Sequence, residues 1–595
     1  MTADDPFAHL HDEAYGDAFR TPRLDVSGLI DPGGRPIEPL TGGWRLTLDP
    51  FEEGLRQRWF AYDDAPVEVW TTPRDWDPLG GEPVTVPSCW NMVRPEWRHY
   101  EGAVWYTRAL DHRPDTPGER CFLRVGAANY ATSVFLDGCF LGRHAGGSTP
   151  FCVELTGALR VGPNRLMLMV DNSRRAERVP MHHVDWFNYG GLYREVGLLR
   201  LPEVFVKRAG AALVPGSGRT RLAFDVELSD PVDGQVGVSV PCLELDFMLP
   251  VAAGRGRIEV DAAPELWAPD TPKLYDVLWT FGADRFRERI GFREIRVDGE
   301  RILLNGRPVW LAGACVHEDD VHLGKVSTET DVRRRFRHLK ELSANFARLA
   351  HYPHHEHVAR IADEEGVLLW AEIPVYWAID FADPETLADA RNQLAELIAR
   401  DRNRASVVVW GVGNENADTD ARLAFMSALV EGTRAADPTR LVGAACLIDR
   451  EHFAIADRLA AVLDVVGLNE YFGWYEPDFD GLERLLANST PGKPVIVSET
   501  GADAVVGRRG EGRALFSEDW QAEVYRRQFA LLRKASYVQG LCAWLLYDFR
   551  SERRQARLQA GYNRKGLIAA DKSTKKLAFA ALADLYRTVA KSADP

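Results

Sequence analysis

Short apolar runs and helical patterns alternate through residues 296–595. In one helical pattern Phe336 and Leu339 share a face, and Thr328 with Asp331 offers a capping box at the start. Eight apolar runs predict buried strands. They are Pro308–Gly313, Asn345–Leu349, Val367–Glu372, Ser406–Val412, Arg440–Cys446, Asp464–Leu468, Pro494–Ser498 and Gly540–Trp544. Eight strands alternating with helices predict a (β/α)8 TIM barrel.

Two β-rich regions precede the predicted barrel. Residues 1–202 contain short strand patterns, such as Ala131–Gly138, separated by Gly, Pro and Asn. In residues 203–295, the segment Leu222–Leu228 alternates apolar and polar side chains, which is typical of a half-buried strand. Several such strands in a short region predict a small β-sandwich. We therefore predict three domains, 1–202, 203–295 and 296–595.

The composition narrows the class of protein. With 46% hydrophobic and 27% charged residues it is typical of a soluble enzyme, and a net charge of -15 argues against a general nucleic-acid binder. No window approaches the roughly 18 apolar residues of a membrane span. Met1–Phe7 has neither a basic segment nor an apolar run, so we predict no secretory signal. The eight cysteines lack CxxC spacing, and Cys121 and Cys139 fall in apparent strands, which predicts buried free thiols in a cytoplasmic protein.

Two of the predicted barrel strands run into glutamates. Ser406–Val412 continues through glycine to Asn414 and Glu415, and Pro494–Ser498 is followed by Glu499. Barrel enzymes keep their active sites at the carboxyl ends of the strands. Glycoside hydrolysis requires two carboxylates at one site, one as acid/base and the other as nucleophile or base. The structural alternative is that each glutamate caps a helix or pairs with an arginine.

The other strand ends carry further polar and aromatic side chains. These are Arg348, His351, Glu372, Asn414, Asn469, Tyr471, Tyr475, Trp544 and Asp548, with Asn563 and Lys565 after the last strand. The segment His351–His357 is rich in histidine, but it lacks HExxH spacing and Pro353 interrupts it, so we predict a loop and no metal site. No GxSxG elbow or GxxxxGK[ST] phosphate loop is present.

Three motifs resemble glycoside hydrolase family 2: Trp410–Glu415, Pro494–Glu499 and Asn345–Pro353. Val86–Asn91 and Gly146–Phe151 are similar to that family too, so the resemblance covers essentially the whole chain. It implies a multidomain fold, with a sugar-binding-like jelly-roll β-sandwich, an immunoglobulin-like β-sandwich and a catalytic TIM barrel. It also implies an enzyme of carbohydrate metabolism.

Within the family, the chain is similar to the β-glucuronidase branch. Asp185–Leu192 resembles the jelly-roll loop that reaches the active site in that branch, and Asn469–Tyr475 resembles its strand-six motif. Asn563 and Lys565 match its Asn-x-Lys pair, which holds the sugar carboxylate. An ammonium and an amide can both donate to a carboxylate. The resemblance therefore implies retaining, exo-acting hydrolysis of β-D-glucuronides through a covalent glycosyl-enzyme intermediate.

The resemblance also implies roles for the site residues. Glu499 would be the nucleophile, Glu415 the acid/base, Asn414 the partner of the 2-hydroxyl, Trp544 the floor of the sugar site, and Tyr471 would orient Glu499. The full substrate-binding set is Asp185, Arg348, His351, Asn414, Asn469, Tyr471, Tyr475, Trp544, Asn563 and Lys565. No cofactor is needed. The expected partners are small β-D-glucuronides or oligosaccharide ends, with no nucleic acid or membrane, and we expect a homo-oligomer, either a dimer or a tetramer.

The chain departs from the branch at two positions. Gln559 stands where the branch often has arginine, with Arg557 nearby, and Thr500 follows the nucleophile in place of an aromatic residue. Both departures could reshape the pocket, so β-galacturonidase and β-galactosidase remain alternatives. A catalytically silent carbohydrate-binding protein is a third, against which the intact Glu415 and Glu499 argue. The short connection from Glu372 to a helix near residue 383 leaves no room for a long cover loop.

Overall fold

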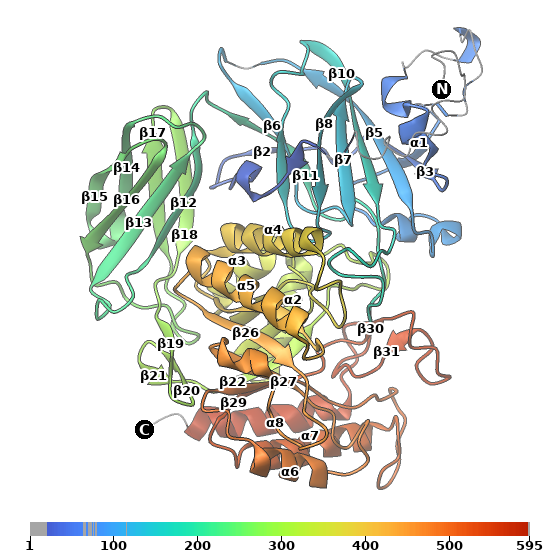
Figure 1. The fold of residues 1–595 in the computed structure, drawn as a ribbon, viewed down its shortest axis with the longest axis vertical. Coiled ribbons are helices and arrows are strands. Elements are labelled where there is room, and N and C mark those ends of the chain that lie inside the picture. Colours follow the sequence, from blue (N-terminus) through green and yellow to red (C-terminus); the bar gives the residue numbers. More distant parts are fainter. Residues whose placement is uncertain are drawn as a thin grey trace.

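Three bodies of secondary structure make up the described chain. The computed structural model describes residues 19, 21–62, 67–69, 74, 76–77, 80–114 and 116–592. Figure 1 shows a β-sandwich in blue and cyan, a second β-sandwich in green, and an α/β body from yellow to red. The multidomain fold class is confirmed, while the boundaries after residues 202 and 295 stay predictions. The predicted absence of a secretory signal concerns Met1–Phe7, which lie outside the described residues.

The first body is a jelly-roll sandwich of two sheets, with strand orders β1-β8-β7-β10-β5-β3-β4 and β2-β11-β6-β9. On β5, Val104 and Tyr106 point between the sheets, and the intervening Trp105 packs on the outer face with Trp59 and Trp76. Both faces of this strand are therefore covered. The elements are β1 Arg23–Leu24, β2 Ile37–Pro39, β3 Trp44–Asp49, α1 Glu53–Arg56, β4 Glu82–Val84, β5 Ala103–His112, β6 Arg120–Val125, β7 Ala131–Leu136, β8 Cys139–Ala145, β9 Phe151–Glu154, β10 Gly162–Asp171 and β11 Val196–Leu201.

The second body packs a three-stranded sheet, β12-β13-β16, against a four-stranded sheet, β15-β14-β17-β18. The predicted alternation in Leu222–Leu228 is confirmed, because its apolar side chains lie in the shared core with Val236 and Val238. A small sheet, β19-β20-β21, leads into the barrel. The strands are β12 Val206–Leu213, β13 Arg221–Leu228, β14 Gly234–Val240, β15 Leu245–Val251, β16 Arg255–Asp261, β17 Tyr275–Phe281, β18 Asp284–Ile290, β19 Ile295–Asp298, β20 Arg301–Leu304 and β21 Arg307–Pro308.

The third body is a closed parallel barrel of eight strands, as predicted. Its strands are β22 Leu311–Val316, β23 Phe346–Leu349, β24 Leu368–Glu372, β25 Val407–Asn414, β26 Leu441–Cys446, β27 Val465–Asn469, β28 Val495–Thr500 and β29 Val538–Ala543. The side chains of these strands divide between two cores. Trp370 and Val409 fill the interior, whereas Leu369 and Trp410 pack against the surrounding helices.

Helices surround this barrel, except that the β26–β27 connection holds only the short 3-10 helix Arg458–Ala461. The predicted capping box is confirmed, because Thr328 accepts the Asp331 N–H and Asp331 accepts the Thr328 N–H. After β29, a hairpin of β30 Phe549–Arg550 and β31 Tyr562–Asn563 lies beside the barrel mouth. The barrel helices are α2 Glu329–Glu341, α3 Glu356–Glu365, α4 Pro384–Asp401, α5 Asp420–Ala436, α6 Asp480–Asn488, α7 Glu518–Leu532 and α8 Leu577–Ser592.

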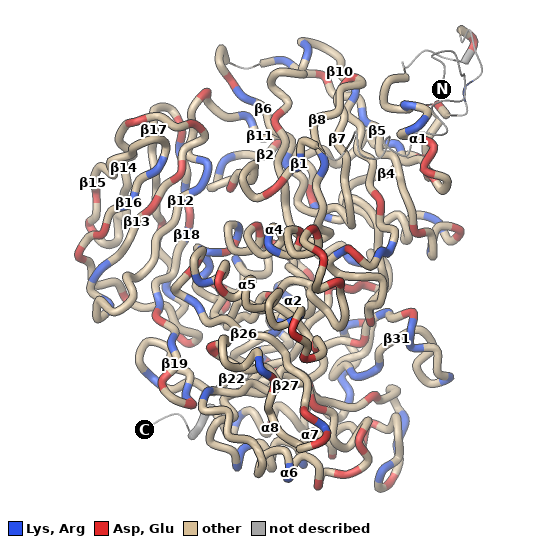
Figure 2. Tube along the Cα trace, viewed as in Figure 1, with Lys and Arg blue, Asp and Glu red and all other residues tan. Residues whose placement is uncertain are grey.

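Surface features refine two of the predictions. Figure 2 shows acidic and basic residues interleaved along the trace, and the described part of the chain shows no continuous basic stripe. Six of the cysteines are buried, but Cys139 and Cys242 are exposed, so the prediction of buried thiols is wrong at these two positions. Cys139 begins β8 directly after a turn, with its side chain in solvent. Among the described helices, none has the length and apolar character needed to cross a membrane.

Candidate active site

The two predicted catalytic glutamates meet at one cavity of about 380 Å³ at the carboxyl end of the barrel. Of the predicted substrate-binding residues, the cavity is lined by Asp185, His351, Asn469, Tyr471, Tyr475, Trp544 and Lys565. Three others do not line the cavity but are buried beside the residues that do, namely Arg348, Asn414 and Asn563. The predicted catalytic and substrate-binding residues therefore belong to one neighbourhood. Asp548, also singled out at a strand end, does not line the cavity and pairs with Lys576.

Irregular strand register turns two of these side chains inward. Trp410 on β25 and Val497 on β28 pack outward against the helices. Strict alternation would send Asn414 and Glu499 outward as well, because they have the same parity. Each strand has a register irregularity at that point, which re-aims the side chain toward the barrel axis. Glu415 follows β25 directly, in a left-handed conformation with φ of 53°.

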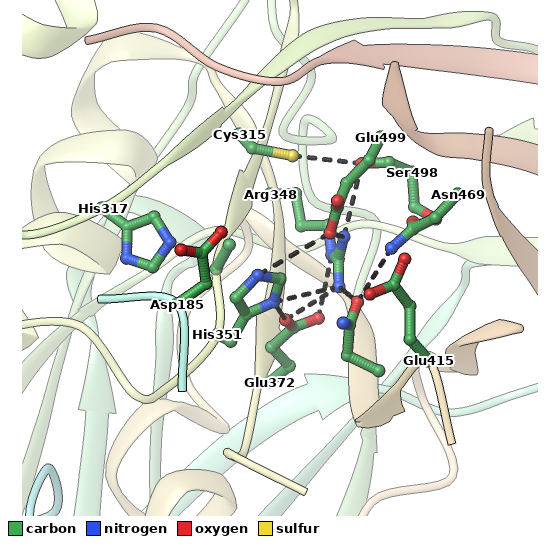
Figure 3. A network of polar contacts seen from close by, with 12 residues as sticks. Asp185, Cys315, His317, Arg348, His351, Glu372, Glu415, Asn469, Ser498 and Glu499 are labelled. Atoms are coloured by element: carbon green, nitrogen blue, oxygen red, sulfur yellow. Dashed lines mark hydrogen bonds and ion pairs between the residues drawn. The ribbon is translucent and has the colours of Figure 1, made fainter. Parts of the chain in front are cut away.

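Arg348 joins the nucleophile candidate to a second carboxylate (Figure 3). Its Nη1 donates to Glu499 Oε1 at 2.8 Å, while Nε and Nη2 donate to the two oxygens of Glu372 at 3.0 and 2.9 Å. Arg348 is completely buried. Burial lowers the pKa of Arg348, but Glu372 and Glu499 raise it by more, so that the net pKa lies well above its usual value. One permanent cation therefore serves two buried carboxyl groups.

Both oxygens of Glu499 accept hydrogen bonds. Tyr471 donates its hydroxyl to Oε2 at 2.7 Å, opposite the Arg348 contact on Oε1. Burial raises the pKa of Glu499 to about 8, with Glu415 adding to the rise and Arg348 and Tyr471 opposing it. The two donors hold the carboxyl plane in one orientation and favour its ionised form.

Asn414 has a free amide donor at the site. Its Oδ1 accepts from Arg348 Nη2 at 2.7 Å and from Asn469 Nδ2 at 3.1 Å. Its Nδ2 is buried and has no hydrogen-bond partner among the described residues. Because a buried amide N–H without a partner is costly, this donor is available to a ligand hydroxyl.

His351 and Trp544 form one wall of the cavity. Their rings stack with centroids 5.0 Å apart, and His351 Nδ1 lies 2.9 Å from Glu372 Oε1. Burial lowers the pKa of His351 well below its usual value, so the imidazole is neutral. A neutral His351 leaves Arg348 as the cation beside Glu499.

Lys565 places a buried ammonium on the cavity wall. Its Nζ donates to Asp503 Oδ2 at 2.9 Å and to the Tyr475 hydroxyl at 3.0 Å. Burial lowers the pKa of Lys565, but Asp503 and Tyr475 raise it by more, so the net pKa lies above its usual value. Next to it, Asn563 accepts the Lys565 N–H at 3.2 Å, and its own Nδ2 is buried without a partner among the described residues.

Arg554 lines the cavity beside Lys565, and no pattern in the sequence pointed to it. Its Nη1 donates to the Tyr475 hydroxyl at 3.1 Å, so that hydroxyl contacts both Arg554 and Lys565. The neighbouring Arg557 is exposed, and neither it nor Gln559 lines the cavity. Arg554 is one of several arginines in the β30–β31 connection, and nothing in their spacing distinguishes it.

Asp185 lines the cavity, but its carboxylate is already occupied. Arg554 Nε lies 3.1 Å from each of its oxygens, and Ser551 Oγ donates to Oδ1 at 2.5 Å. Asp185 comes from the jelly-roll connection between β10 and β11 and therefore crosses to the barrel. In this structure its direct role is to hold Arg554 in place.

Three further neighbours of the site carried no sequence signal or a misleading one. Trp377 Nε1 donates to Glu415 Oε2 at 2.7 Å, from the short β24–α4 connection. Asp503 is the countercharge of Lys565. Thr500, expected to reshape the pocket, instead donates its hydroxyl to Gln528 of α7, outside the barrel. Thr500 follows Glu499 on β28, and successive strand residues face opposite ways.

Among the residues that the structure describes, one group has its potential metal-ligand atoms within 4.8 Å of one another, namely Glu195, His355 and His357. His355 Nε2 lies 2.7 Å from Glu195 Oε2, and its Nδ1 accepts the N–H of His357 at 3.1 Å as the cap of α3. Since Nδ1 acts as acceptor, Nε2 carries the proton and donates to Glu195. The helix cap and the Glu195 contact therefore account for both ring nitrogens of His355.

Comparison with known proteins gives two family matches. Residues 37–202 match the model "Glycosyl hydrolases family 2, sugar binding domain", and residues 295–590 match "Glycosyl hydrolases family 2, TIM barrel domain". A β-glucuronidase of Paenibacillus borealis is 28% identical to the chain over 91% of its length and 96% of the relative. Human β-glucuronidase is 26% identical, over 92% of this chain and 90% of the relative.

Solved structures give the same picture. A β-glucuronidase from an uncultured Clostridium superposes with a TM-score of 0.83 at 26% identity, covering 94% of this chain and 99% of that one. The Bifidobacterium dentium β-glucuronidase complexed with coumarin-3-O-glucuronide gives a TM-score of 0.81 at 26% identity, covering 93% and 97%. The resemblance to β-glucuronidases inferred from motifs is thereby confirmed over nearly the whole chain.

Proposed function

The chain belongs to glycoside hydrolase family 2, and from this premise we propose that it is a retaining exo-β-glucuronidase. The substrate would be a small β-D-glucuronide or the glucuronide end of an oligosaccharide. The relatives named above are β-glucuronidases, and one of them holds a glucuronide in its solved structure. We also keep the predicted homo-oligomer and cytoplasmic location as proposals, testable by light scattering and cell fractionation.

The proposed mechanism has two displacements. Glu499, as carboxylate, attacks the anomeric carbon, while Glu415 protonates the leaving oxygen as the C–O bond breaks. Glu415 then takes a proton from water, and the water oxygen displaces Glu499 from the anomeric carbon. Arg348 and Tyr471 hold Glu499 in line for attack, and the unpaired Nδ2 of Asn414 donates to the 2-hydroxyl. The chemistry uses no cofactor.

The observation that carries the glucuronide assignment is the cationic wall of Lys565 and Arg554. Tyr475 joins the two cations through its hydroxyl. The ammonium has three protons, of which the described contacts use two, and the amide of Asn563 adds an unpaired donor beside it. A carboxylate at C6 could accept from the remaining ammonium proton and from the Asn563 amide in charge-assisted hydrogen bonds, whereas a neutral hydroxymethyl group is a weaker acceptor.

The test compares charged and neutral sugars. Lys565→Ala should reduce kcat/KM for an aryl β-glucuronide by about a hundredfold, on the order of 2.7 kcal/mol, and leave an aryl β-glucoside nearly unaffected. Lys576 is the matched control: it is equally buried and pairs with Asp548, but it does not line the cavity. Lys576→Ala should leave the glucuronide-to-glucoside ratio unchanged. Equal losses on both sugars with Lys565→Ala would reduce the proposal to a family 2 β-glycosidase of unassigned specificity.

β-Galacturonidase activity is the second candidate, because the wall of Lys565 and Arg554 recognises a carboxylate at C6 and not the configuration at C4. A panel of aryl β-glycosides decides between them: glucuronide, galacturonide, galactoside, glucoside and mannoside. We expect the highest kcat/KM for the glucuronide, and a kcat/KM for the galacturonide above that for any of the three neutral sugars. A preference for the galactoside would contradict the proposed role of the cationic wall.

A further inference from the structure

Trp377 contacts the proposed acid/base directly and has no role in the mechanism above. It lies in the connection between β24 and α4, and its Nε1 donates to Glu415 Oε2 at 2.7 Å. The indole also lines the cavity. It is therefore placed to act on the proton that Glu415 transfers.

The backbone around Trp377 is locked to the turn that carries Glu415. Trp377 has a φ of 54°, a left-handed conformation that costs a bulky residue free energy. It is held there by two hydrogen bonds: its N–H donates to the Asn414 carbonyl at 2.9 Å, and its carbonyl accepts from Asn416 Nδ2 at 2.8 Å. Since Asn414 and Asn416 flank Glu415, the donor and the acceptor move as one unit.

Two side chains contact the indole ring. Tyr376 stacks on it with centroids 4.5 Å apart and an interplanar angle of 30°. The Arg553 guanidinium lies 4.4 Å from the ring centroid. These contacts restrict rotation of the ring, whose N–H points to Glu415.

We propose that Trp377 selects which oxygen of Glu415 carries the catalytic proton. An indole N–H only donates, so Oε2 must accept and a proton on Oε2 would face another donor. The proton is therefore held on Oε1, for which the described residues offer no hydrogen-bond partner. In the first step that proton passes from Oε1 to the leaving oxygen. In the second step Oε1 takes one back from water, and the indole keeps its own proton throughout.

This inference rests on the proposed role of Glu415 and makes Trp377 a positioning residue. Trp377→Phe removes the donor and keeps an aromatic ring. For alkyl glucuronides, which leave only when protonated, kcat/KM should fall by about ten- to a hundredfold. For a dinitrophenyl glucuronide, which needs no proton, it should change little. The plot of log kcat/KM against the pKa of the leaving group should therefore become steeper.

Trp310 is the matched control, since its Nε1 donates to the Val538 carbonyl at 3.2 Å and the residue does not line the cavity. Trp310→Phe loses an indole hydrogen bond too, but should keep the wild-type slope. Replacement of Trp377 by 3-benzothienylalanine, in which sulfur takes the place of N–H, removes the donor with almost no change of shape. It should reproduce the steeper slope even if the phenylalanine variant folds poorly.

Glu415→Gln, measured on the same set of glucuronides with different leaving groups, separates this inference from the proposed function. If Glu415→Gln steepens the slope and both Trp377 variants leave it unchanged, or slow all substrates by one factor, the Trp377 inference is wrong and the role of Glu415 stands. If Glu415→Gln slows every substrate equally, the acid/base assignment itself is wrong.

Discussion

Arg348 is shared between Glu499 and Glu372, and this sharing changes during the proposed reaction. While Glu499 is ionised, the guanidinium faces two carboxylates. Once Glu499 has become an ester to the sugar, its charge is gone and Arg348 interacts with Glu372 alone. The residue that holds the nucleophile thus keeps a partner in both states, and the buried cation is never left unpaired.

The two glutamates should respond differently to loss of their charge. Glu499→Gln should abolish turnover for every leaving group, because no covalent intermediate forms. Glu415→Ala should retain activity on activated phenyl glucuronides, and azide should accelerate it by replacing the water that needs a base. Steady-state rates and product analysis for the glycosyl azide measure both effects. Failure of azide to rescue Glu415→Ala would contradict the assignment.

Retention of configuration follows from the same pair. The two carboxyl groups should act at the separation of about 5–5.5 Å that retaining enzymes use. Proton NMR of the first product should then show the β-anomer of glucuronic acid before mutarotation. An α-anomer as first product would exclude the double displacement.

The pH profile should reflect the buried nucleophile. Burial raises the pKa of Glu499 to about 8, against the opposing effects of Arg348 and Tyr471. Because the carboxylate is the attacking form, kcat/KM should fall as pH drops through this value, so the acid limb lies above the ordinary carboxyl range. Tyr471→Phe removes one donor to the carboxylate and should move the limb to still higher pH. An acid limb near pH 4.5, shared by the wild type and Tyr471→Phe, would contradict this expectation.

Glu470, next to Tyr471, should make stability depend on pH. Burial raises its pKa to about 8, and its Oε1 has no hydrogen-bond partner among the described residues. A raised pKa means that the folded chain binds the proton more tightly than the unfolded chain. This stabilisation is complete below the unfolded pKa and is lost as pH rises toward 8. Glu470→Gln should therefore reduce the fall in Tm between about pH 6 and pH 8. An unchanged fall would mean that other groups cause it.

At the scale of single residues, the site residues at the ends of barrel strands could be predicted from the sequence. Those in the loops between elements could not. Glu415 and Glu499 lie at the carboxyl ends of barrel strands, and Lys565 lies in the segment after the last barrel strand, so their neighbourhood follows from the barrel. Arg554 and Asp503 lie in irregular connections, whose path depends on tertiary contacts that no periodicity encodes. The contact of Asp503 with the Lys565 ammonium and that of Arg554 with the Tyr475 hydroxyl could therefore not be predicted from the sequence.

At the scale of elements, the eight barrel strands were predictable because apolar runs of the right length alternate with helical patterns. The register irregularities of β25 and β28 were not, although they decide which way Asn414 and Glu499 point. An irregularity of this kind comes from the pairing of neighbouring strands, and strict alternation in the sequence gives the wrong face. The hairpin β30–β31 was also missed, since its strands have two residues each.

Close packing within β25 gives a test at this scale. A Cβ at Gly411 would lie 2.2 Å from Trp370 Nε1 and 2.4 Å from Glu372 Cβ. Gly411→Ala should therefore displace Glu372, disturb Arg348 and reduce kcat by at least about tenfold.

Gly432, on the exposed face of α5, is the control for this test, because a Cβ there would have no atom within 4 Å. Gly432→Ala should raise stability by about 0.5–1 kcal/mol without loss of activity. Full activity of Gly411→Ala would show that the site tolerates the shift.

At the scale of the whole molecule, buried ion pairs connect the jelly roll to the barrel. Arg194, 2% exposed, donates to Glu318 at 3.0 Å and to the carbonyls of Ser148 and Pro353 at 2.6 and 2.7 Å. Burial raises the pKa of Glu318, but Arg194 and nearby cations lower it by more. The net pKa of Glu318 therefore lies far below its usual value. Glu318 therefore remains ionised and depends on Arg194.

Removal of Arg194 should consequently be costly. Arg194→Met leaves the Glu318 carboxylate buried without its countercharge, with an expected loss of about 3–5 kcal/mol and a clear drop in Tm. The double variant Arg194→Met, Glu318→Gln should recover part of that loss, because no buried charge remains. Equal destabilisation in both variants would indicate that the lost carbonyl contacts dominate, and not the unpaired charge.

Asp185 and Arg554 are separated by 369 positions in the chain, yet they form one ion pair at the cavity. Recombination between homologous genes usually exchanges whole domains. A chimera that took its jelly roll from a relative without this aspartate would inherit Arg554 with no fixed orientation, and a barrel transplanted alone would lose the same contact. Substrate choice in this enzyme would thus be inherited through the junction of two domains, and directed evolution of its specificity should vary both sides of that junction together.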